Sequence, residues 1–103
     1  MMSNEADKEL LELAAKAAGI ADGDVFYDMD QDKIWNPLTD DGDALRLAVK
    51  LKMTVDVRLF DDKVQVRAYH EPSMYHVNEK GDQFAATRRA IVRAASEIGR
   101  SMG

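Results

Sequence analysis

The stretch IWNPLTDDGDALRLAVKLK, residues 34–52, determines most of what the sequence predicts about the fold. Pro37 keeps its neighbour Asn36 out of the helical region, and Thr39 is a favoured residue for capping a helix. Aspartates follow at once, where carboxylates complement the exposed amide groups of a first helical turn. The stretch therefore predicts a helix that begins directly after a Thr39 cap. The aliphatic residues at helical spacing are Ala44, Leu47, Ala48 and Leu51.

The apolar arc of this predicted helix is wide. Leu45 and Val49 extend the aliphatic stripe, and Asp43, Arg46 and Lys50 form a narrow polar edge at spacings of three and four residues. Such an arc is typical of a helix that is buried over much of its circumference.

Helices are also predicted near both ends of the chain. The first spans about 4–18 and stops at Gly19, and the last runs from an Asp82 cap to a stop at Gly99. The residues of the last helix that are expected to face inward are Phe84, Ile91, Ala94, Ala95 and Ile98.

Alternating apolar and polar residues predict strands in the second half of the chain. Residues 53–60 and 63–70 alternate with a period of two around a two-aspartate turn, which predicts a hairpin. A much shorter hairpin, or an ordered loop, is expected where residues 26–27 face residues 34–35 across an acidic turn. Residues 71–81 contain proline, asparagine and glycine and are expected to form a loop.

These elements predict one α+β domain over residues 1–103, with three helices packed on a small antiparallel sheet in the order α-(ββ)-α-β-β-α. One face of the sheet is apolar. The other contains Asp56, Arg58 and Arg67, which predicts cross-strand ion pairs or exposure to water.

The composition limits the class of protein. The chain has 103 residues, 46% of them hydrophobic, and no cysteine, so we expect one soluble domain without disulfides or thiolate metal sites. No apolar run approaches the roughly 18 residues that span a bilayer, and the acidic start of the chain is not typical of a signal peptide. No membrane association is expected.

The net charge of −5 is unevenly distributed. Residues 20–43 hold eight acidic side chains and one basic side chain, whereas residues 44–103 hold seven acidic and eleven basic ones. The chain is acidic overall and has no concentrated basic face, so general nucleic-acid binding is not expected.

Two groups of side chains could bind a metal. Asp40, Asp41 and Asp43 are hard-cation ligands by type, but acids at a helix start are also common without any ion. His70 and His76 lie six residues apart in a region without a ligand signature. We therefore predict no metal site, and keep a metal-dependent enzyme or ligand-binding protein that uses the aspartates as the alternative.

Catalytic motifs are absent from the sequence. It contains no G-x-S-x-G, no glycine-rich phosphate loop and no H-E-x-x-H. No catalytic residue and no cofactor is predicted, and a binding role is favoured over an enzymatic one.

A partner surface is predicted on the last helix. Arg89, Arg93 and Arg100 return to one side of it, and we expect Arg89 and Arg93 to face solvent and contact a partner. Trp35 is a candidate interface anchor if it is partly exposed, although a tryptophan before a buried helix is more often in the core. A nucleic-acid-associated role for the arginines is a second alternative.

The segments WNPLTDDGDALRLAVKL, residues 35–51, and ATRRAIVRAASEIG, residues 86–99, resemble the phage ABA sandwich domain, a family of small phage- and prophage-encoded proteins of uncharacterised function. Together they cover about a third of the chain. The resemblance implies a bacteriophage origin and α/β/α layering, which would need a helix over the charged sheet face. It supplies no catalytic residues.

From these observations we expect a small phage accessory protein that acts by binding another protein. Its location would be the cytoplasm of an infected or lysogenic bacterial host. Its partner would be an unknown phage or host protein, and the chain itself a monomer or small homo-oligomer.

Overall fold

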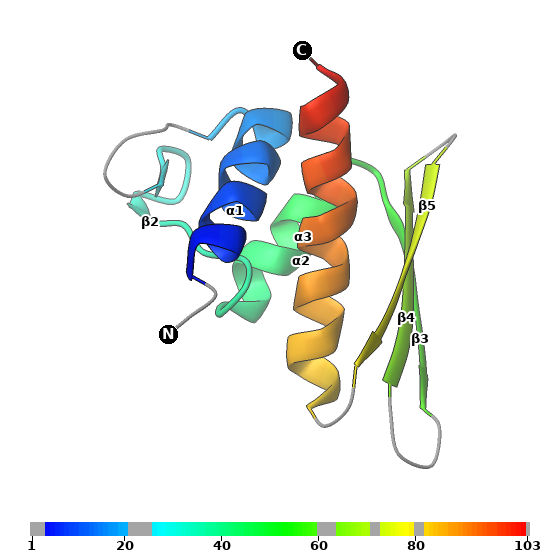
Figure 1. The fold of residues 1–103 in the computed structure, drawn as a ribbon. Coiled ribbons are helices and arrows are strands. Elements are labelled where there is room, and N and C mark those ends of the chain that lie inside the picture. The colour runs from blue at the N-terminus through cyan, green and yellow to red at the C-terminus, as the bar shows by residue number, and fades with distance from the viewer. Residues whose placement is uncertain (1–3, 21–25, 60–63, 71–72, 80–81, 103) are drawn as a thin grey trace.

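The computed structural model describes residues 4–20, 26–59, 64–70, 73–79 and 82–102. The α+β class and the order of the elements are confirmed, with one strand more than predicted. In chain order the elements are α1 (Asn4–Ala18), β1 (Tyr27–Asp28), β2 (Lys33–Ile34), α2 (Asp41–Lys50), β3 (Thr54–Leu59), β4 (Val64–His70), β5 (Ser73–Glu79) and α3 (Gln83–Ser101) (Figure 1).

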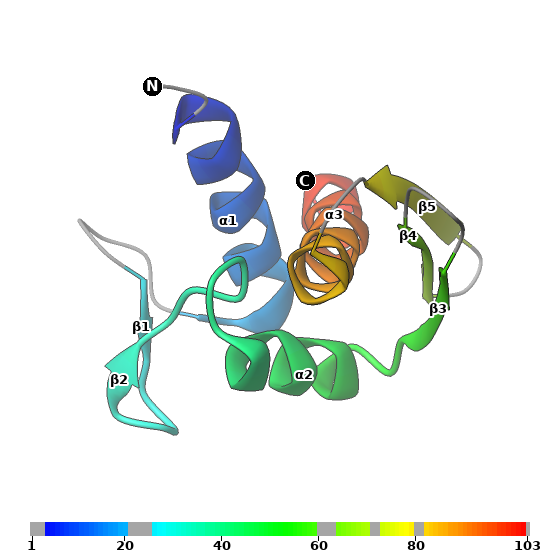
Figure 2. The same cartoon turned by 90° about the horizontal axis from the view of Figure 1, so that it is seen from below.

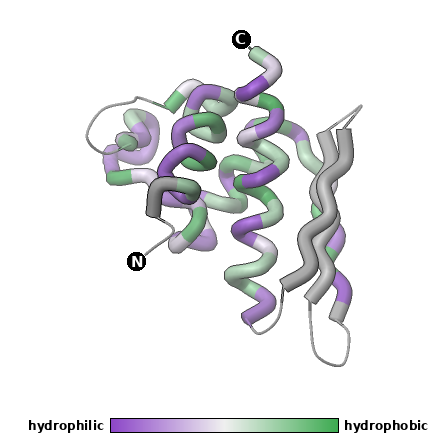
Figure 3. The backbone as a smooth tube through the Cα atoms, in the orientation of Figure 1, coloured by the Kyte–Doolittle hydropathy of each residue, from purple (hydrophilic) through white to green (hydrophobic). Residues whose placement is uncertain are grey.

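Helix α3 is the central element of the fold. It packs against α1 and α2 on one side and against the strands on the other (Figures 1 and 2). Hydrophobic and hydrophilic stretches alternate along the helices, as expected where one face of each is buried (Figure 3). All described helices therefore lie on one side of the sheet, and the described residues do not form the α/β/α layering that the resemblance implied, with a helix over the charged sheet face.

The sheet is antiparallel, with the strand order β3-β4-β5. Val57 lies opposite Val66, and Val66 lies opposite Val77. The predicted hairpin of residues 53–70 is confirmed, and the residues of its turn lie outside the described part of the chain. The expectation of a loop throughout 71–81 is wrong, because pairing with β4 makes Ser73–Glu79 a strand despite its weak local signal.

The short β1–β2 hairpin is also confirmed. Tyr27 lies opposite Ile34, and the Trp35 amide donates to the Phe26 carbonyl at 2.8 Å. Asp28 organises the acidic turn, since its carboxylate accepts hydrogen bonds from the amides of Asp30 and Gln31. Asp28 therefore has a structural role in this turn.

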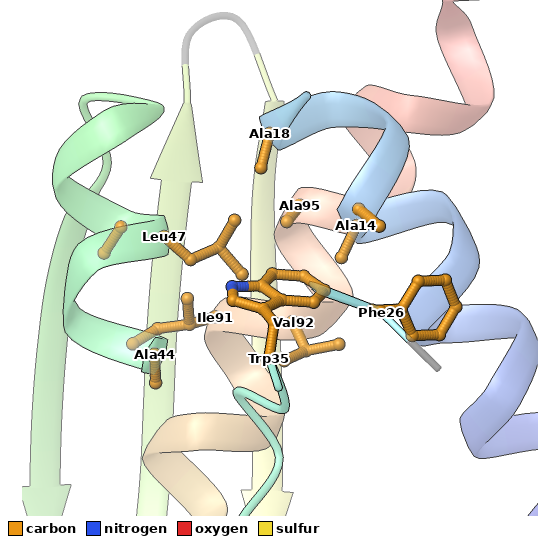
Figure 4. Close-up of a cluster of buried hydrophobic side chains, with 11 residues drawn as sticks. Ala14, Ala18, Phe26, Trp35, Ala44, Leu47, Ile91, Val92 and Ala95 are labelled. Atoms are coloured by element: carbon orange, nitrogen blue, oxygen red, sulfur yellow. The ribbon is translucent and has the colours of Figure 1, made fainter. Parts of the chain in front are cut away.

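Trp35 is in the core. Its ring is buried between the helices and meets Phe26 edge-on, with ring centroids 6.2 Å apart (Figure 4). The expectation that Trp35 might anchor a partner at the surface is wrong. Its ring joins the hairpin to the three helices. The helical side chains around it include Ala14, Ala18, Leu47, Val92 and Ala95.

Small residues set the close packing of α1 on α3. A Cβ added at Gly99 would lie 1.9 Å from the Leu13 carbonyl oxygen, so the two backbones are in contact there. The first helix spans 4–18 as predicted, and Gly19 follows it with a φ of 72°. The last helix does not stop at Gly99 but continues to Ser101, and the glycine instead allows the close approach of α1.

Candidate functional site

A buried aspartate lies at the start of α2. The cap of this helix is Asp40, whose carboxylate accepts from the Asp43 amide at 2.8 Å, and the prediction that Thr39 is the cap is wrong. Thr39 instead donates its hydroxyl to the Asn36 carbonyl. Asp43, which was expected on a polar edge, is 0% exposed.

Three groups donate hydrogen bonds to the Asp43 carboxylate. Lys33 Nζ lies 3.0 Å and Arg46 Nη2 lies 2.8 Å from one oxygen, and the Asn36 amide donates to the other at 2.9 Å. Burial alone raises the pKa of Asp43, but the hydrogen bonds from Asn36, Arg46 and Lys33 outweigh burial and leave that pKa below its usual value. The hydrogen bond to Asp43 in turn raises the pKa of Lys33. Asp43 is therefore a charged structural group.

The aspartate cluster does not converge on one point. Asp40 faces Lys33 at 3.4 Å, and Asp41 turns to α3, where it meets Arg88 at 2.6 Å. Among the described residues, no group of three or more acidic or histidine side chains could hold a metal ion. The alternative of a metal site at Asp40, Asp41 and Asp43 therefore has no geometric support.

The two histidines cannot be placed by their side chains, which lie outside the described part of the structure. The backbone register places His76 opposite Arg67, and His70 opposite Ser73. The two are thus not directly opposite each other in the ladder.

The arginines of α3 do not form one stripe. The Arg88 Nε donates to the Leu38 carbonyl at 2.7 Å, and its Nη1 meets Asp41, so this side chain joins α3 to α2. Arg89 meets Asp7 at 3.2 Å and joins α3 to α1. The expectation that Arg89 faces solvent freely is therefore wrong, since this partly exposed side chain forms an ion pair with Asp7 of the same chain.

Arg93 and Arg100 are exposed, as expected of surface arginines. Arg100 lies 3.4 Å from Glu97, one turn earlier in the same helix. The four residues predicted to form one docking surface thus lie in three different places. Arg89 joins two helices, Arg93 and Arg100 are at the surface, and Trp35 is in the core.

A groove of about 520 Å³ lies between α2, β3 and the first half of α3. Its floor is formed by buried Ala44, Ala48 and Ile91. Leu45, Val57 and Phe84 line its sides and are 64%, 43% and 59% exposed. The other lining residues are Asp41, Val55, Gln83, Thr87 and Arg88.

Two predictions of burial, one on α2 and one on α3, are wrong. Leu45 and Val49, which were expected to widen the buried face of α2, are exposed, and Phe84 does not face inward. Ala44, Leu47 and Ala48 are buried as predicted. Because a wide buried arc and a buried stripe next to an exposed one look the same in a sequence, the groove could not be recognised from residues 44–51 alone.

The groove is mainly apolar, and the two charged side chains at its polar end neutralise each other. The carboxylate of Asp41 and the guanidinium of Arg88 pair with each other there, and Gln83 and Thr87 offer uncharged polar groups. Clustered exposed aliphatic and aromatic side chains with a polar border are typical of a surface that binds a protein.

Comparisons with known proteins add no family. The chain matches no protein-family model, no curated protein and no solved structure. Among the described helices, none is long and apolar enough to cross a membrane.

Proposed function

We propose that this protein is a small accessory protein that acts by binding another protein through the groove between α2, β3 and α3. The observation that supports this proposal is the exposure of Leu45, Val57 and Phe84 around a buried floor. In water these side chains lose the free energy that burial would provide, about 25 cal/mol for each Å². A partner that inserts an apolar side chain would recover it.

The polar end of the groove would orient the partner. Asp41 and Arg88 are 2.6 Å apart, and each retains hydrogen-bonding capacity beyond that contact. A peptide amide or carbonyl near this pair would find a partner without burying an uncompensated charge. The groove therefore favours an apolar, largely uncharged segment.

The origin and the partner class rest on the sequence resemblance. Residues 35–51 and 86–99, which form most of α2 and α3, are the parts similar to the phage ABA sandwich domain. We accordingly propose a phage or prophage protein that works in the cytoplasm of its bacterial host and binds a phage or host protein.

The test is affinity capture from phage-infected host lysate with the immobilised 103-residue chain. Phe84→Ala and Leu45→Glu should each lower recovery of the captured partner at least about tenfold, because alanine shortens the apolar wall and glutamate adds a charge. Met29→Glu is the matched control, since Met29 is an exposed apolar residue in the β1–β2 turn that does not line the groove. Equal capture by all variants would refute the proposal.

A further inference from the structure

Strand β3 has an open edge beside the groove. It pairs with β4 on one side, and on its other side, the one nearest α2, no described strand lies (Figure 2). The groove-side residues Val55 and Val57 alternate with Asp56 and Arg58 on the opposite face. An open edge of this kind pairs readily with another strand unless charges or bulges prevent it.

The charges of β3 have opposite signs two residues apart. Within the chain, the Arg58 Nε lies 3.4 Å from the Asp56 carboxylate, and both side chains keep partial exposure. Charges on an edge strand usually oppose pairing with a second strand. Here their order makes the strand complementary to itself.

The complementarity selects one antiparallel register. When Val57 lies opposite the Val57 of a second copy, each Asp56 lies opposite an Arg58, and each Val55 opposite a Leu59. A shift of two residues along the partner brings Asp56 opposite Asp56, or Arg58 opposite Arg58, and like charges opposite each other destabilise a ladder. A shift of one residue places charged positions opposite apolar ones.

We infer that two copies of this chain associate through their β3 strands and join their three-stranded sheets into one continuous antiparallel sheet. The contact adds a backbone hydrogen-bond ladder and covers Val57, which is otherwise 43% exposed beside the groove. The inference deepens the proposed function and rests on it in one respect, that this side of the molecule is a binding surface. A second copy of the chain then occupies the β3 side of the groove.

The other edge of the sheet has no such pattern. Strand β5 contains no arginine or lysine, so no two-fold register brings opposite permanent charges together there. The pairing is therefore specific to β3.

Sedimentation equilibrium of the 103-residue chain over a concentration series tests the inference. The wild type should approach twice the 11.5 kDa mass of the chain. Arg58→Glu, which lies opposite neutral Gln65 within the sheet, should raise the dimer Kd about tenfold or more, since it places like charges opposite each other twice. Arg100→Glu makes the same charge change at the end of α3 and should leave the Kd unchanged.

A mixing experiment isolates the register. Asp56→Arg alone should also dissociate, because two arginines then oppose each other across the axis. An equimolar mixture of Asp56→Arg and Arg58→Glu restores opposite charges at both contacts and should form a heterodimer. Circular dichroism and a thermal melt show whether each variant is folded. If Asp56→Arg fails to fold beside Arg67, Val57→Lys serves as the second dissociating variant. It should dissociate the dimer because it places two ammonium groups together at the two-fold axis.

A wild type that stays at 11.5 kDa up to millimolar concentration would overturn the inference. So would a dimer that folded Arg58→Glu and Val57→Lys leave intact, because it would use another surface. If a monomeric wild type still captures a lysate partner and Arg58→Glu weakens the capture, β3 pairs with a foreign strand. That outcome refutes the second copy and leaves the proposed function standing.

Discussion

Two sides of α2 reverse the usual relation between polarity and burial. Asp43 is fully buried, whereas Leu45 and Val49, two and six residues later, are 64% and 67% exposed. The aspartate is buried because three donors satisfy its carboxylate, and the aliphatic residues are exposed because no described element covers them. Burial along this helix is thus decided by the available partners and not by residue type.

The largest effect is expected for the buried aliphatic residue of the same helix. Leu47→Ala should lower the free energy of unfolding by about 2–5 kcal/mol, because it leaves a cavity among the side chains around Trp35. Chemical denaturation measures the change. Leu45→Ala is the matched control and should change stability by less than about 0.5 kcal/mol. Similar losses for both variants would mean that the two sides of α2 do not differ.

A somewhat smaller loss is expected when the charge of Asp43 is removed. Asp43→Asn keeps the size of the side chain but weakens the charged hydrogen bonds with Lys33 and Arg46, so about 2–3 kcal/mol should be lost. Lys33 and Arg46 are partly exposed and can be rehydrated, which limits the loss. Denaturation curves that overlay the wild type would contradict a structural role for this charge.

The dependence of stability on pH should report the same carboxylate. Its pKa is lower in the folded chain than in the unfolded chain, where an aspartate titrates at about 3.9. The stabilisation is therefore present above the unfolded pKa, and is lost as pH falls from there through the folded pKa. Thermal melts from neutral to strongly acidic pH should show a smaller acid-induced loss in Asp43→Asn than in the wild type. Identical pH profiles would contradict this assignment.

The smallest effect concerns the start of α2. Asp40→Ala should cost about 1 kcal/mol, because it removes the oxygen that accepts from the Asp43 amide. Thr39→Ala should cost less, because its hydroxyl makes only a 3.4 Å contact with the Asn36 carbonyl. The order of the two losses in denaturation distinguishes the observed cap from the predicted one.

Much of the fold was predictable because its signals are local. The apolar period of residues 4–18, the Asp82 cap and the alternation of residues 53–60 each depend on near neighbours in the chain. Strand β5 was missed because its pairing with β4, and not its own composition, makes it a strand. The continuation of α3 past Gly99 was missed because the reason for that glycine lies in α1.

The candidate site was less predictable for the same reason. The roles of Arg88 and Arg89 depend on Asp41 and Asp7, which are 47 and 82 residues away in sequence. No pattern within α3 distinguishes an arginine that joins two helices from one that faces a partner. The exposure of Leu45 likewise depends on what lies above α2, and periodicity contains no information about that.

The central position of α3 has a consequence for how the protein is made. Helices α1 and α2 and the three strands of the sheet all contact residues 83–101, which leave the ribosome after the other described elements. The contact of Asp7 with Arg89, 82 residues apart in sequence, closes a long loop and forms only once α3 has emerged. The apolar faces that α3 covers in the folded protein therefore remain available to chaperones until residues 83–101 have left the ribosome.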